Sequence, residues 1–161
     1  ETTSREGLAA RQVALAAAER ARAAREAATL DQVTPGEQQP ETEHAFQGEA
    51  TETGIHNGRH WRHGREFQYT LNTRGEKHVT LAVTYSGNDS GRQFDIFVNG
   101  TLIATQELVG EKLGEFVEKQ YPLPGAVLAA ARDGRVTIRF VARKVLAGGV
   151  FDIRLLRPLA H

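Results

Sequence analysis

Apolar side chains recur at every second position in several short runs of the second half of the chain. One run contains Phe94, Ile96 and Val98. A period of two is typical of strands that bury one face. The dipeptide Asn99-Gly100 follows at once, and it favours the type I′ turn, which needs positive φ at both central residues. The pattern therefore predicts a hairpin over residues 92–107 that turns at Asn99-Gly100.

Further runs have the same spacing and are separated by turn-forming residues. Their apolar sets are Phe67, Tyr69 and Leu71; Val79, Leu81, Val83 and Tyr85; Val136, Ile138 and Phe140; and Phe151, Ile153 and Leu155. A weaker strand is expected over residues 115–121, and a helical turn or a loop over residues 125–131. About seven to nine short strands at regular spacing predict a mostly β chain, folded as an antiparallel two-sheet β-sandwich.

The composition divides the chain into three zones. We expect an N-terminal Ala/Arg-rich helix over residues 1–30, an acidic linker with Pro and Gly over residues 31–43, and the β-sandwich domain over residues 44–161. Residues 9–28 hold 11 Ala, the best helix former. Larger apolar residues in the helix are few, so an isolated helix would be marginal. They are Leu8, Val13 and Leu15. We therefore expect the helix to dock on this chain or on a neighbour.

Charge and composition exclude several classes of protein. The 20 Lys and Arg residues balance 20 Asp and Glu residues, whereas a general nucleic-acid binder needs a basic excess to neutralise phosphates. The chain has no cysteine, which excludes disulfides, thiolate zinc sites and a cysteine nucleophile. No apolar run reaches the roughly 20 residues that span a bilayer. We therefore expect no nucleic-acid and no membrane partner, and the oligomeric state stays open.

Charges of opposite sign are segregated around residue 52. Residues 30–52 carry six acidic residues and no Lys or Arg, whereas residues 53–65 carry three Arg, three His and no acid. We expect an acidic strap that lies beside a basic loop. The histidines His56, His60 and His63 suggest a zinc site, hydrogen bonds to the loop's neighbours, or contact with a ligand. On a single strand, His56 and His60 would share a face and His63 would point away.

Trp61 is the only tryptophan, and it allows two interpretations. In one, its indole face is a stacking platform for a sugar ring. In the other, it anchors the core or the rim of the sandwich under the first strand. The loop of residues 86–92 is rich in oxygen ligands but lacks the EF-hand spacing. It predicts either a turn with Asx hydrogen bonds or a calcium site.

No grouping of catalytic residues stands out. Ser86 and Ser90 lack the pattern of a nucleophile elbow. Among Asp89, Asp95 and Asp152, no two are marked as a glycosidase pair. We therefore predict no catalytic residue in this chain.

An ordered series of unusual motifs carries a resemblance over about residues 30–157. The motifs are Pro35-Gly36-Glu37-Gln38-Gln39-Pro40-Glu41, Gly48-Glu49, His56-Asn57-Gly58-Arg59-His60-Trp61-Arg62, Val83-Thr84-Tyr85, Arg92, Phe94-Asp95-Ile96, Ile103-Ala104-Thr105-Gln106, Tyr121-Pro122-Leu123-Pro124 and Ala147-Gly148-Gly149-Val150-Phe151. Together they resemble the C-terminal domain that follows the catalytic barrel in glycoside hydrolase family 127-type β-L-arabinofuranosidases. That family's α-helical barrel uses Cys and Glu zinc ligands. This chain has no Cys and no such barrel, so no catalytic residue is carried over.

More loosely, the chain resembles the galactose-binding-like jelly rolls of family 6 and family 35 carbohydrate-binding modules. Those modules often hold a structural calcium ion with an early Glu and an Asp of the last strand, and Glu49 and Asp152 stand at comparable places. The resemblance implies that Ca²⁺ is possible and that no cofactor is required. The alternative is that each carboxylate pairs with an arginine, such as Arg59 or Arg154. Those modules often place an Asn just before the final Asp, whereas in this chain Gly148-Gly149-Val150 precedes Asp152.

The resemblance implies a non-catalytic accessory domain of a glycoside-hydrolase-type protein, similar to a carbohydrate-binding module and secreted or periplasmic. The alternative is a structural domain that braces the parent's catalytic barrel or an oligomer interface without binding glycan. The excess of Arg over Lys, together with the many Ala residues, suggests a bacterial coding sequence. The sugar and its linkage stay open. The expected ligand-binding residues are Asn57, Arg59, His60, Trp61, Arg62, Asp89 and Arg92.

Overall fold

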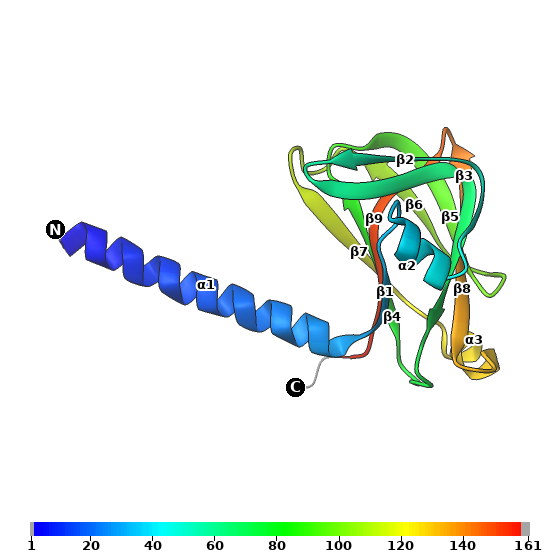
Figure 1. Ribbon diagram of the computed structural model, residues 1–161, viewed down its shortest axis with the longest axis horizontal. Coiled ribbons are helices and arrows are strands. Elements are labelled where there is room, and N and C mark those ends of the chain that lie inside the picture. The colour runs from blue at the N-terminus through cyan, green and yellow to red at the C-terminus, as the bar shows by residue number, and fades with distance from the viewer. Residues whose placement is uncertain (1, 159–161) are drawn as a thin grey trace.

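A computed structural model describes residues 2–158. Residue 1 of the expected helix and residues 159–161 of the expected sandwich lie outside the described residues. Figure 1 shows a β-sandwich from which one long helix extends. In chain order, the elements are α1 (Thr2–Ala28), β1 (Thr29–Val33), α2 (Gln38–Glu43), β2 (Gln47–His56), β3 (Arg59–Asn72), β4 (Thr80–Ser86), β5 (Ser90–Val98), β6 (Thr101–Val109), β7 (Phe116–Pro122), α3 (Gly125–Ala130), β8 (Arg135–Lys144) and β9 (Ala147–Leu156).

Within residues 2–158, nine strands form two packed layers whose hydrogen bonding is continuous. The strand order is β6-β5-β8-β3-β9-β4-β7, with β2 beside β3 and β1 beside β9. All the pairings are antiparallel. The layers join where β3 and β9 pair over a short stretch, from Arg62 opposite Val150 to Gly64 opposite Ala147. The predicted antiparallel β-sandwich is confirmed.

The core lies between the layers and uses the predicted alternating positions. Residues from β3, β5 and β8 face residues from β4, β7 and β9, and Phe67 stacks on Phe140 with ring centroids 5.0 Å apart. Burying one such side chain contributes about 1.5–3 kcal/mol. The predicted hairpin is also confirmed, because β5 and β6 turn at Asn99 and Gly100 with φ of 49° and 82°.

Residues 31–43 differ from the expected linker, because they contain part of β1 and all of α2. Strand β1 pairs with β9 and buries Leu30 and Val33. The imidazole of His44 then ties this segment together, since its Nε2 contacts Asp31 Oδ1 at 2.9 Å and its Nδ1 contacts the Pro40 carbonyl oxygen at 2.7 Å. Few apolar residues reveal β1 in the sequence, so its strand state depends on pairing with distant β9.

Residues 53–65 are not a loop either. Strands β2 and β3 form a hairpin that turns at Asn57 and Gly58, which have φ of 49° and 75°. His56 therefore stands on β2, whereas His60 and His63 stand on β3, so the three histidines do not share a single strand. The turn reverses the chain, so His56 and His63 come to the same pocket.

Helix α1 joins the sandwich directly, without a linker. The Thr29 hydroxyl donates to the Arg25 carbonyl oxygen, Arg25 pairs with Glu118 of β7, and Arg154 Nη1 lies 3.5 Å from Glu26 Oε1. Farther out, the side chains Leu8, Val13 and Leu15 are exposed. The part of the chain that the structure describes has no helix long and apolar enough to cross a membrane.

Candidate functional site

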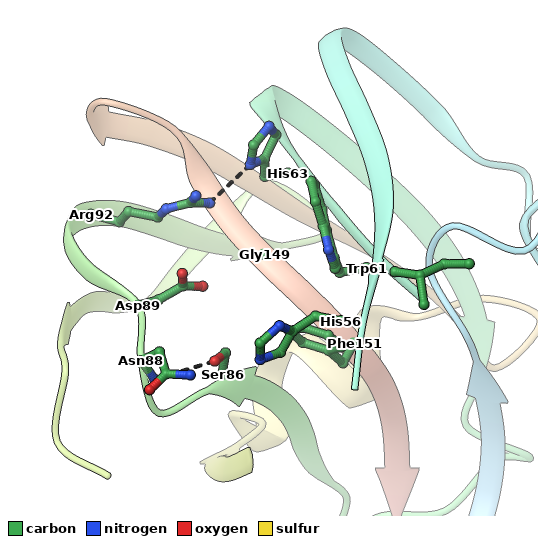
Figure 2. Close-up of a pocket in the computed structure, with 10 residues that line it drawn as sticks. His56, Trp61, His63, Ser86, Asn88, Asp89, Arg92, Gly149 and Phe151 are labelled. Atoms are coloured by element: carbon green, nitrogen blue, oxygen red, sulfur yellow. Dashed lines mark hydrogen bonds between the residues drawn. The ribbon is translucent and has the colours of Figure 1, made fainter. Parts of the chain in front are cut away.

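A pocket of about 330 Å³ opens at one end of the sandwich. Three segments that are distant in sequence build it: the β2–β3 hairpin, the stretch from the end of β4 through the β4–β5 loop into the start of β5, and the start of β9 (Figure 2). Its lining consists of Ile55, His56, Trp61, His63, Ser86, Asn88, Asp89, Arg92, Gly149 and Phe151.

One wall of the pocket is aromatic. Trp61 is half-buried and lies outside the hydrophobic core, and its ring centroid is 4.8 Å from that of His63. Phe151 packs edge-on against Phe116 at 4.9 Å, with the His56 ring 6.3 Å from Phe151. Trp61 is therefore a wall of the pocket rather than a core anchor.

The opposite wall is polar. Arg92 Nη1 donates to His63 Nδ1 at 3.1 Å, which requires the neutral imidazole because a guanidinium is only a donor. Burial and the positive charge of Arg92 lower the pKa of His63, and the negative charges of Glu52 and Asp89 oppose this shift. Within residues 2–158, the Asp89 carboxylate has no side-chain hydrogen bond or ion pair. The pocket therefore offers a charged donor and a charged acceptor beside an aromatic surface (Figure 2).

The β4–β5 loop is held by the turn hydrogen bonds that were expected as one alternative. The backbone N–H of Asn88 donates to Ser86 Oγ at 3.2 Å, and Asn88 Oδ1 accepts from the backbone N–H of Gly114 at 2.9 Å. These bonds fix the loop backbone, and they leave Asp89 and Arg92 to line the pocket. A calcium ion in this loop stays an untested expectation.

Arg62 lies on the other side of β3 and is part of a closed network. Its Nε and Nη2 donate to the two carboxylate oxygens of Glu41 at 2.6 and 2.8 Å, and its Nη1 donates to Thr51 Oγ1 at 2.8 Å. The Tyr69 hydroxyl also donates to Glu41 at 2.5 Å. Burial raises the pKa of Glu41, but the hydrogen bonds from Arg62 and Tyr69 outweigh it and lower this pKa. Arg62 does not line the pocket, although the sequence placed it among the ligand-binding residues.

Three other predicted ligand residues also lie outside this pocket. Asn57 is exposed at the tip of the hairpin. Arg59 stacks over the Phe116 ring at 4.4 Å, and His60 lies 4.0 Å from Glu37. Arg59 and His60 line a separate polar depression of about 230 Å³. Of the seven predicted ligand residues, the pocket thus brings together Trp61, Asp89 and Arg92.

The proposed calcium ligands are not neighbours in the sheet. Glu49 is exposed on β2 opposite Glu66. Asp152 is buried on β9, where it accepts from Gln32 Nε2 at 2.7 Å and from Arg154 Nε at 2.9 Å. Asp152 therefore has the arginine partner that the sequence offered as the alternative. Among residues 2–158, no group of three or more His, Asp or Glu side chains is placed to hold a metal ion.

Sequence reasoning missed several lining residues, although a signal for them was present. Asn57-Gly58 is the same hairpin dipeptide as Asn99-Gly100. Read as a turn, it places His56 beside the strand that carries Trp61 and His63. Nothing local in the sequence brings Gly149 and Phe151 to this place, because β9 reaches it through the long-range pairing with β3.

The fold is similar to that of solved carbohydrate-binding modules. A family 35 carbohydrate binding module from Clostridium thermocellum superposes with a TM-score of 0.54 at 12% identity, covering 70% of this chain and 92% of that chain. The CBM35 from Paenibacillus barcinonensis gives a TM-score of 0.52 at 14% identity, covering 79% and 97%. At such identities the likeness shows the fold.

A comparison with curated protein sequences gives no match. The model of one protein family, described as a family of unknown function, matches residues 24–156 and so spans β1 to β9. The chain therefore belongs to that family, DUF6805.

Proposed function

We propose that this chain is a non-catalytic carbohydrate-binding domain and that the pocket beside Trp61 receives a sugar ring. The observation that carries this proposal is the half-buried Trp61 indole, which lines the pocket together with Phe151 and faces Arg92 and Asp89 across it (Figure 2). Sugar rings combine an apolar face with hydroxyl groups, and small-molecule sites of this kind combine apolar surface with a few placed polar groups.

The size of the pocket limits its ligand. A volume of about 330 Å³ lies near the lower end of the range of small-molecule sites, about 300–1,000 Å³. The pocket therefore suits one sugar unit or a short end of a glycan rather than a long stretch of polymer. Arg92 donates to hydroxyl oxygens and Asp89 accepts from hydroxyl groups, and such charged hydrogen bonds are stronger than neutral ones.

The carboxylates support a non-catalytic role. Asp95 accepts from Thr105 and from Arg143, and Asp152 accepts from Gln32 and Arg154. Two carboxyl groups that act on a glycosidic bond must flank one site, whereas Asp95 and Asp152 do not line the pocket that contains Asp89. From the sequence resemblance, we propose that the parent protein is a glycoside hydrolase and that this chain is its accessory domain.

The experiment is a glycan array with the purified 161-residue chain, followed by calorimetry on each ligand found. Trp61→Ala is expected to weaken binding about tenfold or more while the melting temperature changes little, because Trp61 lies outside the core. His60→Ala changes the neighbouring residue on the opposite face, and it should bind like wild type. Undiminished affinity in Trp61→Ala, or no bound glycan at all, would count against the proposal.

A second candidate is a brace, and one observation favours it. Helix α1 is fixed at its base by Arg25–Glu118 and Arg154–Glu26, and it extends away from the sandwich (Figure 1). A rigid arm of this kind would hold the domain against a neighbouring domain or a second copy. Light scattering over a concentration series tests the second copy. A mass that stays at 17.7 kDa rejects an oligomer interface.

A further inference from the structure

We infer that Gly54 is a positioning residue of the pocket: because it has no side chain, the Trp61 indole settles over the backbone of β2 and leaves its other face to the ligand. The functional consequence rests on the proposed function, whereas the position of the indole does not. Gly54 itself lies outside the lining of the pocket, whereas Trp61, which a Cβ atom at Gly54 would strike, is part of that lining.

The pairing of the strands creates this contact. Gly54 on β2 lies opposite Trp61 on β3. A Cβ atom at Gly54 would lie 2.4 Å from Cζ2, 2.7 Å from Cε2 and 3.1 Å from Nε1 of Trp61. All three atoms belong to the rigid indole, so no flexible end can move aside. Even the methyl group of alanine would therefore displace the whole ring.

On the β9 side of Trp61, an added side-chain atom would fit without displacing the ring. A Cβ atom at Gly149 on β9 would lie 3.7–3.8 Å from Cβ, Cγ and Cε3 of Trp61, which is ordinary van der Waals contact. Trp61 on β3 therefore contacts two strands that pair with β3, and each of them carries a glycine at the contact: Gly54 on β2 and Gly149 on β9. The tight contact is at Gly54, so Gly54 sets the position of the ring.

A ring displaced by a side chain at residue 54 moves away from β2. The β2 side is occupied by the backbone, and the pocket side is open. A side chain at residue 54 therefore drives the indole into the pocket, which reduces the space for a ligand. Gly54 consequently determines how large a ligand the pocket accepts, without touching that ligand.

The single tryptophan makes this inference directly measurable, since all indole emission comes from Trp61. We expect Gly54→Ala to shift the emission maximum and to change acrylamide quenching, and to lower the affinity for each glycan found on the array about tenfold or more. Gly125→Ala is the matched control, because nothing lies within 4 Å of a Cβ atom there. It should keep wild-type emission and affinity. Wild-type emission and quenching in a folded Gly54→Ala variant would overturn the inference.

A double variant covers the case in which Gly54→Ala does not fold. Trp61→Leu removes the ring that the methyl group strikes, so Gly54→Ala added to Trp61→Leu should cost little further stability. A large additional loss would overturn the inference, because the damage would then come from β2 itself. If Gly54→Ala changes the emission but the wild-type chain binds no glycan, the proposed function fails and the positioning role of Gly54 stands.

Discussion

The two faces of β3 differ in how their charges are satisfied. On the strap face, which contains His60 and Arg62, the Arg62 guanidinium donates to Glu41 and Thr51 and stacks over the Phe46 ring at 4.1 Å. On the pocket face, which contains Trp61 and His63, Arg92 meets only a neutral imidazole among the described hydrogen-bond partners. A closed face with matched charges contributes to folding, whereas an open face with unmatched groups is suited to binding.

The largest expected effect comes from breaking the strap face. Glu41→Ala leaves the Arg62 charge buried without its partner, and the two side chains are only 8% and 12% exposed. Removing one partner of a buried pair costs about 3–5 kcal/mol, to be measured by urea denaturation. Glu66→Ala is the control, because it breaks a pair with Arg139 in which the side chains are 36% and 42% exposed. Such a pair contributes about 0–1 kcal/mol, so equal losses in the two variants would contradict the comparison.

Removing a charge from the pocket face should weaken ligand binding and leave the stability of the fold nearly unchanged. Arg92→Ala is expected to leave the melting temperature nearly unchanged and to weaken glycan binding about tenfold or more, since a hydrogen bond to a charged group contributes about 1.5–3 kcal/mol. Calorimetry and thermal melts of the same sample separate the two effects. Arg65→Ala, at an exposed position of β3, is the control. Retained affinity together with a large loss of stability would show that Arg92, like Arg62, stabilises the fold rather than binds the ligand.

Acidification should weaken the pocket face through His63. Burial and Arg92 lower the pKa of His63, so this imidazole is neutral at pH 7 and accepts from Arg92. Protonation turns Nδ1 into a donor and places a second positive charge beside Arg92. The negative charges of Glu52 and Asp89 offset this repulsion only in part. Affinity is therefore expected to fall as the pH drops below about 6.5, the ordinary value for histidine. In His63→Gln this dependence should disappear, and an unchanged pH profile in that variant would exclude His63 as its source.

The smallest expected effect is that of chelation. Asp152 is already engaged by Arg154 and Gln32, and Glu49 lies exposed on β2. We therefore expect EDTA to leave the melting temperature unchanged at neutral pH. A clear decrease that Ca²⁺ restores would instead revive a structural calcium ion at these carboxylates.

The sequence predicted the sandwich well because its evidence is local. Alternation places Phe94, Ile96 and Val98 on one face of a strand whatever that strand pairs with, and the structure buries all three. Asn99-Gly100 needs only its own backbone to make the turn. The same dipeptide at Asn57-Gly58 also forms a turn. His and Arg residues flank it instead of an apolar run, so the sequence there lacks the alternation that marks a hairpin.

The sequence could not decide which side of β3 is covered. Alternation separates Trp61 and His63 from His60 and Arg62, but it does not say which set meets Glu41 and which lines an open pocket. That choice depends on α2, which buries Glu41 against Arg62 and Tyr69, and on β9, which brings Gly149 and Phe151 to Trp61. These contacts join residues far apart in the chain, so only the tertiary structure determines them. The sequence by itself therefore determined the strands and their alternating faces, and the packing between strands decided which arginine stabilises the fold and which one faces the pocket.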